Sequence, residues 1–262
     1  MHISYSLALV LLLSSGAAAT AHAEITGTLG VGAAVVRDYE GSKDSRVMGA
    51  PLFTLKMPTA AGDFILDGQG VSWIPIQGGG FNAGVFATYS PGRRDDQERD
   101  YRYLGSTYLR GMGRIKGSPE AGLLMGWNSP EFSPYIRVQH GFGGTDGNRG
   151  NQATIGAAIG IVRTPRLTVL VTPSLVWTDS KYLQTFFGVT AVQSARSGFK
   201  AYQPQAGFKS GQVDVTATVK LSEHWSVMGM VSAKQLMGDA KKSPLVQSSS
   251  SLEYMSFLIW RF

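Results

Sequence analysis

The alternation of apolar residues with small or polar residues is the feature that most constrains the fold of this chain. Residues 213–221 alternate without a break, and segments 25–35, 81–89, 154–161 and 167–178 repeat the pattern. Successive side chains of a strand point to opposite faces, so each segment has one apolar face and one small or polar face. No segment carries an apolar stripe of helical period over three turns. An all-β chain is therefore predicted.

Two kinds of connection alternate along the chain and divide it into twelve expected strands. An even number of strands, with short turns at one end and long loops at the other, is typical of an outer-membrane barrel. Because segment 63–67 is short for a membrane-spanning strand, ten strands remain an alternative. The expected strands are 25–36, 46–57, 63–67, 70–76, 80–90, 119–128, 132–142, 151–163, 167–178, 204–221, 225–237 and 249–262.

The minor faces of these strands argue against a secreted β-sandwich, which is the alternative all-β fold. They carry mainly Gly, Ala, Ser and Thr, which are too small to fill a sandwich core but suit a barrel lumen. Aromatic residues near the expected strand ends suit the girdles of a membrane barrel. These aromatics are Trp73, Tyr89, Trp127, Tyr135, Trp177, Trp225 and Trp260. We therefore expect a transmembrane antiparallel up-and-down β-barrel in a bacterial outer membrane.

The first 23 residues are typical of a secretion signal. They contain no Lys, Arg, Asp or Glu, and an apolar stretch at 7–13 is followed by Ala21-His22-Ala23, an A-x-A cleavage pattern. The absence of a basic amino-terminal region departs from the usual signal. We expect residues 1–23 to be a signal peptide and residues 24–262 to form one barrel domain.

The final strand carries the sharpest motif. Tyr254, Leu258, Trp260 and Phe262 share one parity and end on an aromatic residue. This pattern resembles the terminal signature by which the barrel-assembly machinery recognises outer-membrane barrels. The plainer interpretation is an ordinary closing strand that ends on an aromatic residue by chance.

The composition gives little support for a catalytic or metal-binding site. The chain has no Cys, which excludes thiolate metal sites and Cys nucleophiles. Beyond the signal segment only His140 and His224 remain, too few for a three-His zinc site. His224 is expected in an exposed turn. His140 is expected on the outer rim, where a nearby Asp95, Asp96 or Asp146 could assist it in acid–base chemistry, so a hydrolase is a further hypothesis. We expect no catalytic residues, no metal and no cofactor.

Two long loops carry candidate binding or gating residues. Loop 92–117 is rich in Arg, and Arg93, Arg94, Arg99 and Arg102 could bind lipopolysaccharide phosphates, although a self-paired solvated loop is the simpler interpretation. The formal charge of +6 would suit nucleic acid, but a secreted barrel meets none, so anionic lipid is the expected partner.

Loop 179–203 carries five aromatic residues, which are costly to leave in water. We predict that it folds into the barrel mouth as a lumen plug, with a helical turn or two at 190–196; a disordered outer loop is the alternative. The plug residues would be Tyr182, Phe186, Phe187 and Tyr202.

Several segments of the chain resemble the MipA/OmpV family of outer-membrane proteins. Segments 182–190 with 197–202, and 238–246, are the most specific, and Lys241-Lys242 and Arg114 depart from the family pattern. The resemblance covers nearly all of the chain after the signal segment; its other segments are 37–43, 62–70, 92–96 and 109–115.

The resemblance implies a non-enzymatic barrel in the outer membrane. The family's best-known role is a scaffold that joins a murein lytic transglycosylase to a murein synthase at the periplasmic face. Restricted, porin-like solute passage in the osmotic response and outer-surface adhesion are the alternatives that the family offers. Because the expected periplasmic turns are short, a scaffold would have to work through the barrel rim, the strand ends or the N-terminal residues near Glu24.

Overall fold

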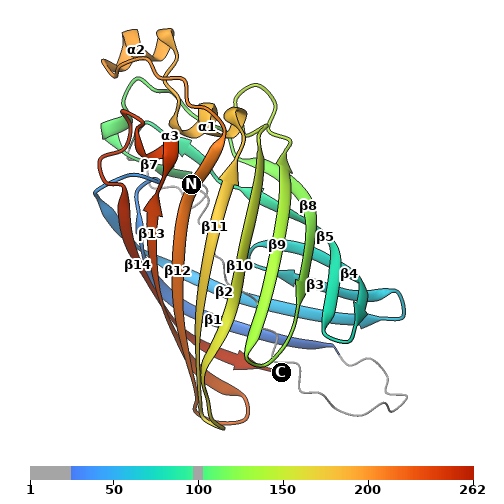
Figure 1. Cartoon of the computed structure of the whole chain (residues 1–262). Coiled ribbons are helices and arrows are strands. Elements are labelled where there is room, and N and C mark those ends of the chain that lie inside the picture. Colours follow the sequence, from blue (N-terminus) through green and yellow to red (C-terminus); the bar gives the residue numbers. More distant parts are fainter. Residues whose placement is uncertain (1–24, 97–102) are drawn as a thin grey trace.

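The computed structural model describes residues 25–96 and 103–262. Within them, twelve antiparallel strands form a closed barrel in which β1 (Thr26–Arg37) pairs with β14 (Ser250–Arg261) (Figure 1). The remaining barrel strands are β2 (Ser45–Thr59), β3 (Gly62–Asp67), β4 (Gly70–Gly78), β5 (Phe81–Ser90), β8 (Ser118–Trp127), β9 (Phe132–Gly141), β10 (Asn151–Arg163), β11 (Leu167–Thr178), β12 (Gly207–Lys220) and β13 (Trp225–Leu236). The predicted fold class is confirmed.

Segment 63–67, the reason for keeping ten strands open, lies within a full member of the barrel. β3 pairs with β2 on one side and with β4 on the other. Its link to β4 is compact because the Asp67 carboxylate accepts hydrogen bonds from the backbone N–H of Gln69 and Gly70, at 2.7 and 3.2 Å. Gly70 has φ +144°, and a Cβ there would lie 2.0 Å from the carbonyl oxygen of Ala87. A glycine is therefore required at this turn.

The outer wall of the barrel is the apolar face that the alternation predicts. On β13 the outward Trp225, Val227 and Val231 are 38–45% exposed, whereas the inward Met228 and Met230 are buried. The same contrast holds on β10, where Ile155 and Ile161 are outward and exposed. A closed barrel pairs its wall strands along both edges while presenting apolar side chains to lipid.

The inner wall differs from the prediction of uniformly small side chains. Inward residues of β1, β13 and β14 form an apolar cluster made of Ala34, Val36, Met228, Met230, Met255 and Phe257. Gly32 leaves room for it, since a Cβ there would lie 2.6 Å from the Phe257 ring. Small and polar residues do line the interior of β10–β12, but large buried side chains also occur on β3, β4 and β5, at Ile65, Ile74 and Phe86.

Aromatic residues gather on the outer wall at the short-turn end. Trp127 ends β8, Phe132 begins β9, Trp225 begins β13 and Trp260 lies near the end of β14, all of them exposed. The prediction that Tyr135 belongs to the aromatic girdle is wrong, because Tyr135 follows the inward parity of β9. A Cβ at Gly156, on the neighbouring β10, would lie 2.6 Å from its hydroxyl.

Short helices and a small sheet occupy the long connections, all at the end opposite the girdle (Figure 1). In the described part of the chain, no helix is long and apolar enough to span a membrane. The predicted signal peptide and its cleavage point lie outside the described residues. The loop elements are β6 (Gly92–Arg94), β7 (Tyr103–Gly105), η1 (Thr107–Leu109), α1 (Ser180–Phe187), α2 (Ala191–Ser197) and α3 (Gly238–Lys241).

Candidate functional site at the outer mouth and the wall

Helix α1 packs its aromatic side into the loop end of the barrel. Asp179 caps the helix by accepting a hydrogen bond from the backbone N–H of Tyr182 at 2.8 Å. Tyr182, Phe186 and Phe187 are at most 6% exposed. They belong to an apolar group, hereafter the mouth cluster, composed of Ile115, Tyr182, Leu183, Phe186, Phe187, Leu236 and Ala240.

Two other loops hold the end of α1 in place. The Arg93 guanidinium donates to the carbonyl oxygen of Phe186, and the Ser243 hydroxyl donates to that of Phe187 at 2.6 Å. Both carbonyls belong to the last turn of the helix, which lacks intrahelical donors. Arg93 is 4% exposed, and burial lowers its pKa to about 10. Loops far apart in sequence therefore converge on one helix.

This placement revises the expected surface of the arginine-rich loop. Arg93 lies inside the loops against α1 and so is not presented to lipid phosphate. Arg94 is paired with Asp96 at 3.1 Å. Arg99 and Arg102 lie outside the described residues, so a lipid-binding role for this loop stays a prediction.

A second apolar group seals the neighbouring loops. Tyr39 donates from its hydroxyl to the carbonyl oxygen of Leu245 at 2.9 Å, and the backbones of Val189 and Tyr202 are bridged at 2.9 Å. Tyr202 packs against this group rather than the mouth cluster, and its hydroxyl donates to the Asp239 carbonyl oxygen at 2.9 Å. Three of the four proposed plug aromatics thus lie together, and the fourth lies beside them.

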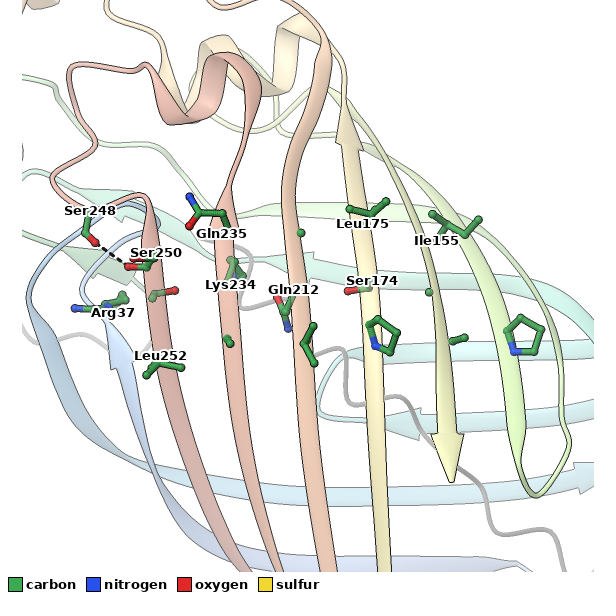
Figure 2. A pocket seen from close by; sticks show the side chains of 18 of the residues that line it. Arg37, Ile155, Ser174, Leu175, Gln212, Lys234, Gln235, Ser248, Ser250 and Leu252 are labelled. Carbon is green, nitrogen blue, oxygen red and sulfur yellow. Dashed lines mark hydrogen bonds between the residues drawn. The ribbon is translucent and has the colours of Figure 1, made fainter. Parts of the chain in front are cut away.

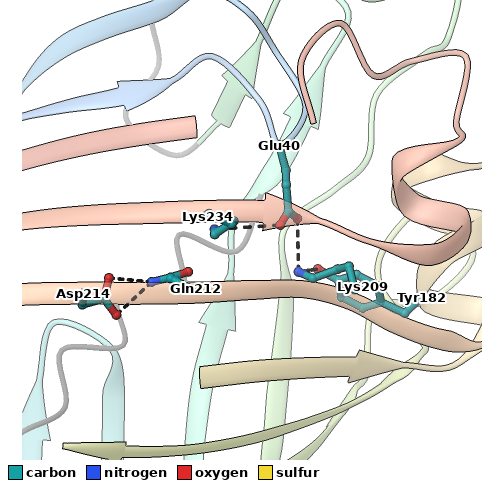
Figure 3. A network of polar contacts seen from close by, with 6 residues as sticks. All are labelled: Glu40, Tyr182, Lys209, Gln212, Asp214 and Lys234. Atoms are coloured by element: carbon teal, nitrogen blue, oxygen red, sulfur yellow. Dashed lines mark hydrogen bonds and ion pairs between the residues drawn. The ribbon is translucent and has the colours of Figure 1, made fainter. Parts of the chain in front are cut away.

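A charged network ties the loops to the barrel wall beneath α1 (Figure 3). The Lys209 ammonium lies 3.1 Å from Glu40 Oε2, and the Lys234 ammonium lies 3.8 Å from Glu40 Oε1. Lys209 also donates to the Tyr182 hydroxyl at 3.4 Å. The three charged side chains are 1–8% exposed. Loop 37–45, β12, β13 and α1 are therefore joined at one buried point.

The protonation states follow from this packing. Burial opposes ionisation of Glu40, but the ammonium groups of Lys209 and Lys234 outweigh it and lower the pKa of Glu40 to about 2. Burial, reinforced by the Glu40 charge, raises the pKa of Tyr182 well above its ordinary value, so the phenol stays neutral. The network is an ion pair between Glu40 and Lys209 with a second cation, Lys234, nearby.

A bulge in β12 puts Lys209 inside the barrel. The register of β11 with β12 passes from Ser210 to Phe208, so Lys209 is the extra residue and is buried together with Ser210. Below it the Gln212 amide donates to both oxygens of the Asp214 carboxylate, at 2.8 and 3.0 Å (Figure 3). A polar line therefore runs down the inner face of β12.

Among the described residues, His140 is not hydrogen-bonded or ion-paired to Asp95, Asp96 or Asp146, the partners proposed for a hydrolase. It is exposed, and its Nδ1 lies 2.9 Å from Asn151 Oδ1. Of its proposed partners, Asp95 accepts backbone N–H groups of loop 92–117, Asp96 pairs with Arg94, and Asp146 pairs with Lys116. His224 lies in an exposed turn as expected. Residues 25–96 and 103–262 contain no group of three potential metal ligands.

The terminal motif forms the barrel seam. The backbones of Phe262 and Gly27 exchange two hydrogen bonds of 3.1 Å, and a Cβ at Gly27 would lie 2.2 Å from the Phe262 ring. The Trp260 and Phe262 rings are 5.2 Å apart. Tyr254 and Leu258 share their outward, exposed parity. Recognition of these four residues by the assembly machinery stays a prediction.

A shallow apolar groove crosses the wall from β9 to β14 (Figure 2). It has a volume of about 1070 Å³, and its outward side chains Ile155, Leu175 and Leu252 are 41–57% exposed. These residues belong to the same apolar face that surrounds the barrel, so the groove is part of the lipid-facing surface.

Sequence reasoning missed two parts of the mouth. α1 was unassigned, although Asp179 is a good helix cap and the apolar residues at 182, 183, 186 and 187 have helical spacing. The charged network was also missed. Lys209 and Lys234 on expected strands were its signal, since charges on a barrel strand need a partner inside.

A closed antiparallel barrel with an apolar outer wall, an aromatic girdle and short turns at one end defines the class of outer-membrane β-barrel proteins. The profile of the family described as MltA-interacting protein MipA matches residues 29–262, and the chain belongs to this family. The resemblance found in the sequence and the outer-membrane location are thereby confirmed.

The relatives found by sequence are outer membrane proteins by their descriptions. The chain is 24% identical over 205 residues to the outer membrane protein YiaT of Escherichia coli O157:H7, covering 73% of this chain and 68% of that protein. The match to YiaT of Escherichia coli strain K12, also 24% identical, spans 97 residues, 37% of this chain and 39% of that protein. An outer membrane channel from Pseudomonas putida F1 aligns with a TM-score of 0.46 and 6% identity, over 94% of this chain and all of that one.

Proposed function

We propose that the protein is a non-catalytic outer-membrane anchor that binds a murein lytic transglycosylase at its periplasmic rim. The description of its family, MltA-interacting protein, supports this partner, because MltA is a murein lytic transglycosylase. A murein synthase would then be recruited to the same complex. The periplasmic rim is the end with short turns, as is usual for such barrels.

The buried mouth cluster is the observation that carries the choice of an anchor over a pore. Tyr182, Phe186 and Phe187 fill the loop end as a lumen plug, with Tyr202 securing the adjacent loops. The ion pair between Glu40 and Lys209 fastens that plug to the wall. Opening the mouth would expose apolar surface and separate buried charges, which is costly.

Restricted solute passage is the second candidate, and the polar inner face of β12 favours it. Gln212 and Asp214 would line a path beneath the plug if the outer loops moved. Swelling of proteoliposomes in small sugars tests this. The anchor function predicts no swelling above that of protein-free liposomes.

The route to the membrane completes the proposal. Residues 1–23 act as a signal peptide that is removed, and the assembly machinery reads Tyr254, Leu258, Trp260 and Phe262 on the last strand. Arg99 and Arg102 of loop 92–117 contact lipopolysaccharide.

Direct binding is the decisive experiment for the anchor function. The purified barrel, reconstituted into bilayer nanodiscs, is titrated with a purified murein lytic transglycosylase. Nanodiscs that carry an unrelated outer-membrane barrel are the control. We expect saturable binding to this protein only, with a Kd of about 1 μM or tighter, typical of a specific complex. Equal signals from both kinds of nanodisc would refute the function.

A further inference from the structure

Charge is distributed unevenly around the periplasmic rim. On the side of β2–β5 the turns 59–62 and 78–81 carry no charged residue, and the nearby Lys56 is paired with Asp63 at 2.7 Å. On the side of β10–β14 the turns and strand ends carry four exposed cations. These residues, hereafter the basic arc, are Arg163, Arg166, Lys220 and Arg261.

Backbone contacts make the basic arc continuous. The N–H of Lys220 donates to the carbonyl oxygen of Arg166 at 2.8 Å, which joins the turn of β10–β11 to the end of β12. The N–H of Arg261 donates to the carbonyl oxygen of His224 at 2.8 Å, which joins the β12–β13 turn to the end of β14. The two turns lie side by side at the lower tip of the barrel (Figure 1).

The four cations of the basic arc have no acidic partner within bonding distance in the part of the chain that the structure describes. Across the described residues, none of their side chains forms an ion pair or a hydrogen bond, and Glu223 and Glu131 are the exposed acids in the adjoining turns. The mouth shows the opposite behaviour, since its cations Lys209 and Arg93 are buried and bonded. The four cations, on strand ends and a short turn, outnumber the two acids of the adjoining turns and create a positive field that faces the periplasm.

The direction of these side chains favours a soluble partner over lipid. Arg261 has the inward parity of the buried Met255 and Phe257, and Lys220 has the inward parity of β12. The outward parity at the same level is taken by Trp225 and Trp260, which belong to the aromatic girdle. Phospholipid phosphates would be met from the outward side. Lys220 and Arg261 instead flank the barrel opening toward the periplasm.

We infer that the basic arc is the docking surface for an acidic face of the periplasmic partner. The inference rests on the proposed function, in which that partner is a murein lytic transglycosylase. Exposed charges at an interface rim speed association and orient the partner, and salt screens them. Lys220, Arg166 and Arg261 present a continuous set of donors to carboxylates at a place where the short turns offer few other contacts.

Charge reversal tests the inference in zwitterionic nanodiscs. The variant Arg166→Glu/Lys220→Glu is compared with wild type for binding of a purified murein lytic transglycosylase at low and high salt. The control, Lys181→Glu/Lys200→Glu, makes the same charge change at exposed positions of the outer loops. We expect the rim variant to bind about tenfold or more weakly and to lose salt dependence, with the control unchanged. A heat-dependent gel shift shows that each variant is folded.

The outcomes separate this inference from the function on which it rests. Equal binding by wild type and the rim variant would overturn the basic arc and leave the anchor function standing. No binding by wild type would overturn both. A loss of binding that appears only in nanodiscs containing phosphatidylglycerol would show that the cations act on lipid, and would also overturn the arc as a protein-docking surface.

Discussion

The outer mouth and the periplasmic rim of this barrel use charge in opposite ways. At the mouth, Lys209 and Lys234 are buried against Glu40, and long loops pack over them. At the rim, Lys220 is exposed at the end of β12 and Arg166 is exposed in the turn between β10 and β11. A buried pair fixes one arrangement of the loops, because separating it leaves an uncompensated charge. Exposed cations cost the fold little and remain available to a partner.

The largest expected effect comes from removing one partner of the buried pair. Lys209→Met leaves Glu40 with the more distant Lys234, and should destabilise the outer mouth by about 3–5 kcal/mol. Chemical unfolding of the protein in detergent, with hydrogen exchange of α1, measures it. The double variant Glu40→Gln/Lys209→Met should recover most of the loss. Unchanged exchange in Lys209→Met would contradict a structural role for the pair.

Lowering the pH should destabilise the outer mouth more than the periplasmic rim. Because the folded pKa of Glu40 is lowered to about 2, its contribution to stability is full above the unfolded value near 4.5 and is lost as the pH falls toward 2. The loss should amount to about 3 kcal/mol across that window. Unfolding midpoints measured from pH 7 to pH 2 test this, and Glu40→Gln should flatten the profile. An unaltered acid profile in that variant would count against the assignment.

A smaller effect should follow from the Tyr182 hydroxyl. Tyr182→Phe keeps the buried ring and removes the 3.4 Å contact with the Lys209 ammonium. We expect a loss of about 1 kcal/mol, seen as faster exchange of the α1 amides. Tyr182→Ala is the contrasting variant, since it also removes a buried ring and should cost about 3–5 kcal/mol. Similar losses in the two variants would mean that the ring packs less closely than described.

The smallest effect should come from the rim. Lys220→Ala removes an exposed cation without a bonded partner, so the free energy of unfolding should change by less than about 0.5 kcal/mol. Chemical unfolding of Lys220→Ala is compared with that of Lys209→Met, because Lys209 is a buried lysine on the same strand. A large destabilisation at Lys220 would show that the rim is structural after all.

Period-two alternation was sufficient to predict the barrel wall, because lipid imposes one rule on every outward side chain. The sites of the short turns therefore followed from local pattern, and so did the count of twelve strands, although the short segment 63–67 left ten strands open. The apolar cluster of the inner wall, with Met228, Met255 and Phe257, was not predicted, because a lumen accepts either small residues or a packed cluster. Alternation alone does not distinguish the two.

The mouth was predictable only in part. The aromatic content of loop 179–203 suggested burial, and Tyr182, Phe186 and Phe187 are indeed buried. Its partners come from distant segments, and the contacts of Glu40 with Lys209 and of Arg93 with α1 depend on how the loops fold over the closed barrel. Residue spacing within one segment carries no information on such contacts.

Ion conductance of the wild-type protein in planar bilayers tests the central claim, that the mouth is closed and function resides at the rim. In the proposed function the mouth cluster and the Glu40–Lys209 pair close the loop end, so the barrel should insert without steady conductance at neutral pH. Stable open channels in wild type under those conditions would contradict a sealed mouth and make solute passage the better account.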